Sequence, residues 1–142
     1  MGKYRFLEDV AIADSAFEAE AESLEDLFRT CATATFEVMA DTSTIEPKSK
    51  EDVELAGDNP DELLFDWLAE LIYLKDSKSM LFGKFEIIIE QADGFKLTAA
   101  AWGERADQKK HKVRVDVKAV TYHLLEVKQV DSKWMAKVVL DT

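Results

Sequence analysis

The last two residues of the printed sequence bring two carboxylates together. Asp141 carries one on its side chain, and Thr142 carries the other as the C-terminal group. Anionic oxygen donors of this kind suit hard cations such as calcium or magnesium, and calcium tolerates irregular geometry better. Terminal groups are also commonly frayed and solvated. The spacing alone is therefore compatible both with a cation site and with a plain chain end.

A second group of polar residues lies inside an apolar stretch, residues 117–128, which reads V-K-A-V-T-Y-H-L-L-E-V-K. Thr121, Tyr122 and His123 interrupt its apolar residues. His123 is either a hydrogen-bonded histidine within a strand or a residue that faces a partner or a site, because imidazole serves both purposes. The sequence leaves both interpretations open.

Several familiar catalytic devices are missing from the sequence. No spacing among the five glycines matches a phosphate-binding P-loop or a dinucleotide fingerprint. The two histidines, His111 and His123, are too dispersed for a histidine-rich metal site, and neither a G-x-S-x-G nor an H-E-x-x-H motif occurs. We therefore expect the protein not to be a self-sufficient enzyme.

The charge of the chain limits its partners. It carries 29 acidic and 18 basic residues, a net charge of -11, and binding to nucleic acid needs a concentrated basic face. The local basic cluster, residues 109–114, is interpreted as a solvated loop leading into a strand. We expect no direct binding of nucleic acid, because an acidic protein is better suited to a basic protein surface or to a cation.

The length and composition predict one domain, residues 1–142, with 47% hydrophobic residues to fill its core. No apolar run approaches the roughly 18 residues of a membrane span, and residues 1–5 lack a signal-peptide profile. A cytoplasmic protein is expected. Cys31, the single cysteine, is predicted to be buried as a small hydrophobic residue, which excludes cysteine-based zinc or redox chemistry.

The pattern of apolar residues predicts the elements that position these groups. Ser23 caps a helix over residues 24–40, and Asn59 followed by Pro60 begins a second helix with Trp67 on its buried face. Alternating residues predict strands over 4–7, 11–19, 85–89, 95–101, 113–117 and 134–140, with 119–128 continuing or bending the fifth of these. The expected class is α+β, with two helices packed on a mixed, mostly antiparallel sheet in a single two-layer domain.

Four motifs together resemble the archease family over essentially the whole chain. They are the stretch 117–128 quoted above, F-E-V-M-A-D-T-S-T-I-E-P-K (36–48), L-L-F-D-W-L-A-E-L-I-Y-L (63–74) and the aspartate-ended segment 134–142. The resemblance implies an accessory protein of an RtcB-type tRNA-splicing RNA ligase. Such a protein promotes guanylylation and multiple turnover of the ligase and alters its nucleotide specificity, without being an enzyme itself.

The same resemblance implies a metal site formed by Asp14, Asp141 and Thr142, with calcium or another hard divalent cation bound. Many family members have His-Thr-Ala-Asp where residues 11–14 read Ala-Ile-Ala-Asp, so no role of that histidine is transferred. Thr142 replaces a more usual aliphatic residue, which does not affect a contact through its carboxylate.

Three further polar positions, Asp41, Asp66 and His123, are candidates for a partner-facing or functional role. The simplest interpretation of Asp66 is a solvated helix residue. Two alternative functions stay open: a chaperone-like interaction module, and a small metal-dependent hydrolase in which Asp14 and Asp141 hold a metal-activated water.

Overall fold

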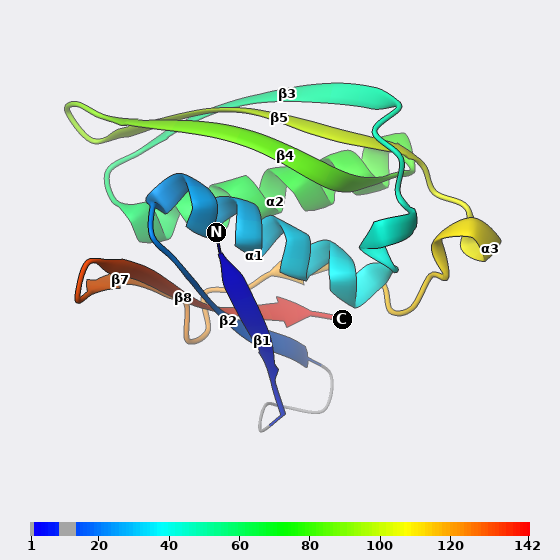
Figure 1. Ribbon diagram of the computed structural model, residues 1–142, viewed down its shortest axis with the longest axis horizontal. Helices are drawn as coiled ribbons and strands as arrows, with labels where there is room; N and C mark the ends of the chain where they lie inside the picture. The colour runs from blue at the N-terminus through cyan, green and yellow to red at the C-terminus, as the bar shows by residue number, and fades with distance from the viewer. Residues whose placement is uncertain (1, 9–13) are drawn as a thin grey trace.

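The computed structural model describes residues 2–8 and 14–142 (Figure 1). In chain order the elements are β1 (Lys3–Leu7), β2 (Asp14–Ala21), α1 (Leu24–Met39), the 3-10 helix η1 (Thr42–Thr44), β3 (Ser49–Gly57), α2 (Pro60–Lys78), β4 (Met80–Gln91), β5 (Phe95–Arg105), α3 (Gln108–His111), β6 (Ala119–Val120), β7 (Glu126–Val130) and β8 (Lys133–Asp141).

The described strands form two antiparallel sheets with the long helices between them. One sheet has the order β1-β2-β8-β6, with β7 also paired to β8, and the other has the order β3-β5-β4. Figure 1 shows α1 and α2 in the layer between these sheets. The predicted α+β class, with two main helices and antiparallel strands, is confirmed. The strands are divided between two sheets, however, so the described part of the chain has three layers where two were expected.

This division follows from how much of each helix surface is apolar. A helix that is apolar on only one stripe covers one sheet, whereas one that is apolar on most sides must be covered on most sides. Both helices are of the second kind, because buried residues occur throughout each of them. In α1 these are Leu24, Leu27, Phe28, Thr30, Cys31, Ala32, Ala34, Thr35, Phe36 and Met39, and in α2 they are Leu63, Leu64, Trp67, Leu68, Leu71, Ile72, Leu74 and Lys75.

The helix starts agree with the predicted caps. The Ser23 side chain accepts a hydrogen bond from the Asp26 N–H at 3.1 Å, and the Asn59 side chain accepts one from the Glu62 N–H at 2.9 Å. Each bond satisfies a backbone donor that has no partner within the helix. The first long helix therefore begins at Leu24, and the second begins at Pro60, as predicted.

The core is centred on Trp67 of α2, which is fully buried. Its indole N–H donates to the Phe28 carbonyl of α1 at 3.1 Å, and its ring meets Phe85 of β4 edge-on at 6.1 Å between centroids. Cys31 is also fully buried, as predicted, and burial raises the pKa of its thiol. The thiol is therefore a core group.

The structure differs from the prediction between β5 and β7. Residues 113–118 are not a strand. The Arg114 N–H donates to the Met39 carbonyl at 2.7 Å and the Val115 N–H donates to the Val38 carbonyl at 3.4 Å, both at the end of α1. The Lys75 ammonium then bonds the Asp116 carboxylate at 2.7 Å and the Val117 carbonyl at 3.0 Å, which holds this segment against α2. The alternating valines predicted a strand. The N–H groups of Arg114 and Val115 bond to carbonyls of a helix and not to a neighbouring strand.

Among the described residues, no helix is long and apolar enough to span a bilayer.

Candidate functional site

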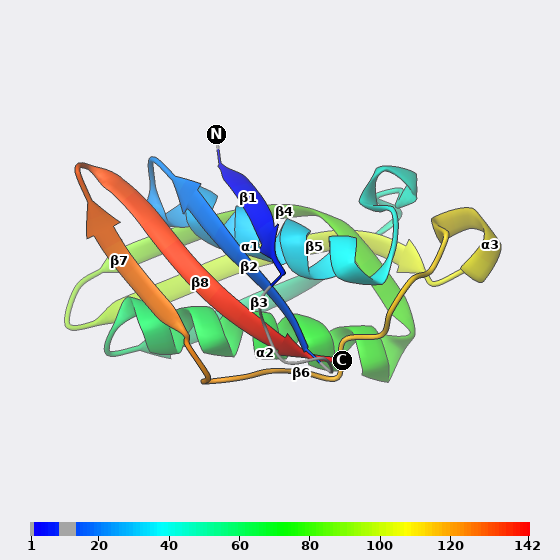
Figure 2. The ribbon, with the colours of Figure 1, turned by 90° about the horizontal axis from the view of Figure 1, so that it is seen from below.

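The structure places two of the predicted metal ligands opposite each other on neighbouring strands. Asp14 begins β2, Asp141 ends β8, and these two residues are partners in the antiparallel register. Figure 2 shows the end of β8 beside the start of β2. On the other side of β8, Asp141 is paired with Ala119 of β6, and its carbonyl accepts the Lys118 N–H at 2.8 Å. The backbone of Asp141 is therefore held by strands on both sides.

The backbone register thus places two acidic residues at directly opposed positions. Like charges at directly opposed positions of an antiparallel pair destabilise it, and a bound cation removes that repulsion. Carboxylate oxygens are the donors that calcium and magnesium prefer. In the part of the chain that the structure describes, no three His, Cys, Asp or Glu side chains converge as a metal site would require.

The other three candidates lie apart from this pair. Asp41 caps η1, and its carboxylate accepts the Ser43 hydroxyl at 2.6 Å and the Ser43 N–H at 3.1 Å. These hydrogen bonds lower the pKa of Asp41. Asp66 is exposed on α2, as expected, and His123 is exposed in the turn between β6 and β7. The interpretation of His123 as a histidine within a strand is therefore wrong.

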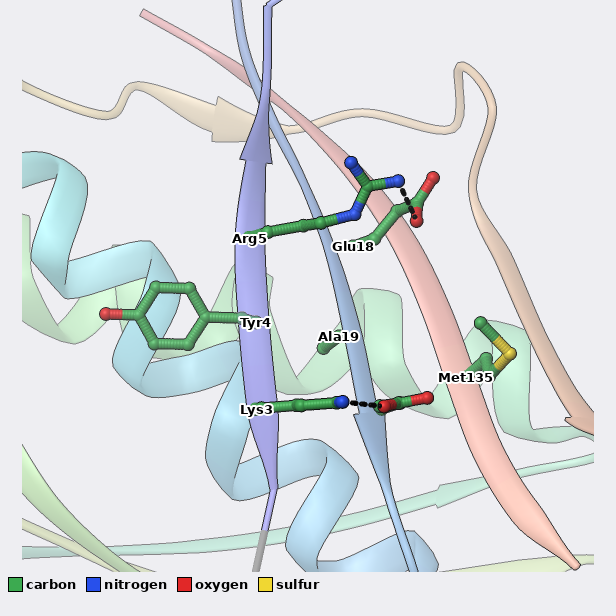
Figure 3. A pocket seen from close by; sticks show the side chains of 7 residues that line it. Lys3, Tyr4, Arg5, Glu18, Ala19 and Met135 are labelled. Atoms are coloured by element: carbon green, nitrogen blue, oxygen red, sulfur yellow. Dashed lines mark hydrogen bonds and ion pairs between the residues drawn. The ribbon is translucent and has the colours of Figure 1, made fainter.

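A hollow of about 390 Å³ lies on the outer face of β1, β2 and β8, toward the strand ends far from Asp14 (Figure 3). Its charged side chains are paired with one another: Lys3 lies 2.6 Å from Glu20, and Arg5 lies 3.0 Å from Glu18. Ion pairs at such exposed positions contribute little stability. None of the predicted functional residues lines this hollow.

Sequence reasoning missed a buried polar cluster around His111, which was expected to lie in a solvated loop. His111 is fully buried, and its Nδ1 accepts the Asp107 N–H at 2.9 Å. The other ring nitrogen, Nε2, therefore carries the proton and donates to Glu104 at 2.9 Å. Asp107 also caps α3 by accepting the N–H groups of Lys109 and Lys110. The spacing of Asp107 four residues before His111 was the sequence signal that could have indicated this capped turn.

The Glu104 carboxylate is the common hydrogen-bond acceptor of this cluster. It accepts the Glu46 N–H at 2.8 Å, the His111 ring N–H, and the Lys110 ammonium at 2.9 Å. Because all three donors favour the ionised form, they hold the pKa of Glu104 well below its usual range. The cluster ties α3 to β5 and to the segment after η1. Its satisfied hydrogen bonds indicate a structural role.

Comparison with known proteins identifies the family. The Archease protein family matches residues 4–142. The chain belongs to this family. The protein archease of Methanothermobacter thermautotrophicus is 42% identical over 130 residues, 91% of this chain and 92% of that protein. The protein archease of Sulfurisphaera tokodaii is 37% identical over 141 residues, 99% of each chain.

Solved structures agree with the archease assignment. The solution structure of Methanobacterium thermoautotrophicum protein 1598 superposes with a TM-score of 0.86 at 38% identity and covers 98% of both chains. A crystal structure described as an archease and possible chaperone from Thermotoga maritima has a TM-score of 0.64 at 20% identity, covering 97% of this chain and 98% of that one. At that identity the second likeness establishes only the fold.

Replacing Glu104 by Gln is expected to flatten the acid dependence of stability of this archease. The folded-state pKa of Glu104 lies below the ordinary value of 4.5. The carboxylate therefore stabilises the fold above that value, and this contribution is lost as the pH falls through the lower, folded-state pKa. The wild-type melting temperature should drop between about pH 5 and pH 2 by more than that of Glu104→Gln.

Circular dichroism melting curves across this pH range measure the effect. Glu90 of β4 is exposed, so Glu90→Gln is the matched control and should keep the wild-type pH dependence. Parallel pH profiles for wild type and Glu104→Gln would show that Glu104 does not contribute in this way.

Proposed function

We propose that this protein activates an RtcB-type tRNA-splicing RNA ligase by promoting its guanylylation and its multiple turnover, and that it alters the nucleotide specificity of the ligase. The observation that carries the proposal is the register of Asp14 opposite Asp141 at one end of the five-stranded sheet, in a chain of the archease family. In this proposal the ligase holds the nucleotide and the RNA, and the archease performs no chemistry itself.

Activation of this kind needs only a difference in binding. A partner that binds the guanylylation-competent state of the ligase more tightly than the other states shifts the population toward it. A preference of about 1.4 kcal/mol shifts the ratio of states tenfold. The net charge of -11 makes direct RNA binding unfavourable, so tRNA would contact the ligase.

The proposed cation is calcium or another hard divalent ion held by Asp14, Asp141 and Thr142. The donor set fits, because every predicted ligand supplies carboxylate oxygen and calcium accepts irregular oxygen coordination. When bound, the cation would neutralise the two opposed aspartates. The residues themselves hold the end of β8 against the start of β2.

The decisive experiment measures guanylylation of the purified cognate ligase with and without this protein, at substoichiometric and excess ratios. The proposal expects a rate increase that persists over many turnovers of ligase per archease. No stimulation at any ratio would overturn it. A parallel phosphatase and nuclease screen of the archease alone should be negative, and activity there would favour the metal-dependent hydrolase.

Removing a predicted ligand is expected to weaken calcium binding by about tenfold or more, equivalent to about 1.4 kcal/mol. The changes are Asp141→Ala and deletion of Thr142, and both affect a chain end where little core is at stake. Isothermal titration calorimetry measures the affinity. Asp52→Ala, an exposed aspartate on the other sheet, is the control and should bind calcium like wild type. Equal affinity for all four proteins would remove these residues from the site.

A chaperone-like interaction module is the second candidate; the Thermotoga maritima protein that shares the fold is itself described as a possible chaperone. It predicts suppression of client aggregation in the absence of any ligase. Cys31 offers no redox switch for such a role, because its thiol is buried and its pKa is raised.

A further inference from the structure

An exposed aromatic stack lies where the turn between β6 and β7 meets the start of α2. The rings of Phe65 and Tyr122 are parallel to within 5°, with their centroids 3.8 Å apart. Tyr122 is nevertheless 69% exposed. The Tyr122 ring thus has one face covered by Phe65 and most of its surface in water. Tyrosines exposed in this way commonly anchor protein interfaces.

The turn that carries Tyr122 is held firmly in place. The N–H and the hydroxyl of Thr121 both donate to the Val139 carbonyl at 3.0 Å, and the Leu125 N–H donates to the Tyr122 carbonyl at 3.2 Å. On the α2 side, the Asp61 carboxylate accepts the Val127 N–H at 3.4 Å. A side chain presented from a fixed turn loses less conformational entropy when a partner binds.

A hollow of about 480 Å³ lies beside this stack, and its charge has one sign. The residues that line it are Asn59, Asp61, Glu62, Tyr122 and Leu125. The two charged residues among them, Asp61 and Glu62, are both acidic and lie in the first turn of α2. The exposed Asp66 lies in the next turn. An aromatic face rimmed by carboxylates suits a cationic side chain, because the ring and the acids attract the same charge.

We infer that the Tyr122 surface, defined as Asn59, Asp61, Glu62, Phe65, Tyr122 and Leu125, binds an arginine- or lysine-bearing segment of a protein partner. A cationic side chain stacks on the open face of Tyr122, and Glu62 supplies the opposing charge. The same carboxylates repel phosphate, which disfavours nucleic acid at this surface. The inference does not depend on the proposed cation or on the ligase, because none of the residues that define this surface is a proposed cation ligand.

The test uses short synthetic peptides as probes of the whole protein. An (Arg-Gly)₅ peptide is titrated into ¹⁵N-labelled protein and followed by NMR, with (Glu-Gly)₅ and a ten-nucleotide single-stranded RNA as comparison probes. The expected result is a set of shift changes centred on residues 59–66 and 121–126 with the arginine peptide alone. Such localisation separates this surface from diffuse attraction to a protein of charge -11.

Variants then identify the groups responsible. Tyr122→Ala should weaken peptide binding by about tenfold, and Glu62→Gln should weaken it severalfold and reduce its salt dependence. Tyr122→Phe keeps the ring and should bind like wild type. Tyr73→Ala, which removes another exposed tyrosine of α2, is the matched control.

The outcomes divide clearly. Localised shifts that depend on Tyr122 support the inference, and circular dichroism on each variant establishes that its fold is kept. Shifts spread over the acidic surface, or unchanged binding by Tyr122→Ala, would overturn it. Localised shifts with the RNA but not with the arginine peptide would also overturn it. Loss of this binding with normal guanylylation would leave the ligase proposal standing.

Discussion

Trp67→Ala is expected to destabilise the protein by about 3 to 5 kcal/mol, the range for removing a buried aromatic side chain. The indole is fully buried between α1 and β4, so alanine leaves a cavity in the helix layer and removes the hydrogen bond to the Phe28 carbonyl. A loss of this size is a large share of the stability of a typical domain. Any loss of ligase activation by this variant should therefore follow from unfolding.

Urea unfolding followed by circular dichroism measures the change in free energy. Tyr73 lies on the same helix and is 63% exposed, so Tyr73→Ala is the control and should change stability by about 0.5 kcal/mol or less. A loss below about 1 kcal/mol for Trp67→Ala would mean that the core collapses around the smaller side chain.

The local features of the fold were predictable because their causes are local. The Ser23 and Asn59 caps fixed the starts of the long helices, and Asp131 with Ser132, both at positive φ, form the reversal between β7 and β8. The alternation from Phe85 onward predicted two strands that lie within β4 and β5, and these pair as a hairpin. In each case the residues that determine the structure lie within a few positions of one another.

The partition into two sheets was not predictable from such local signals. Alternation shows that one face of a strand is buried, but it does not show against which helix. The segment around Val113 and Val115 illustrates the same limit, because its backbone bonds to the end of α1 and leaves both valines exposed. His111 was misjudged because Glu104, which pairs with it, is seven positions away and on another element.

For the candidate site, the sequence and the structure answer different questions. The printed sequence places Asp141 beside Thr142, but nothing local relates them to Asp14, more than a hundred positions earlier. The family resemblance brought the three together as a prediction, and the β2–β8 register then placed Asp14 opposite Asp141. Whether they bind calcium stays a prediction. Residues 9–13, which include most of the stretch where the family histidine is missing, lie outside the described residues.

Asp14→Ala is expected to show the opposite behaviour to Trp67→Ala: the fold is kept and activation of the ligase is lost. Like charges at directly opposed positions destabilise a strand pair, so without metal the variant should be at least as stable as wild type. With the charge removed, the proposed cation loses a ligand, so activation that depends on the cation should be lost. Melting curves with and without calcium, together with the guanylylation assay, test both halves of this prediction.

The control for Asp14→Ala is Asp52→Ala, which removes the same charge from the three-stranded sheet and should leave calcium binding and activation unchanged. Calcium should raise the melting temperature of wild type and of Asp52→Ala but not of Asp14→Ala, because ligand binding stabilises only a fold that retains the site. A folded Asp14→Ala protein that activates the ligase normally would remove Asp14 from the site. An Asp14→Ala protein that fails to fold would instead assign this residue to the structure, because stability and activation would then be lost together.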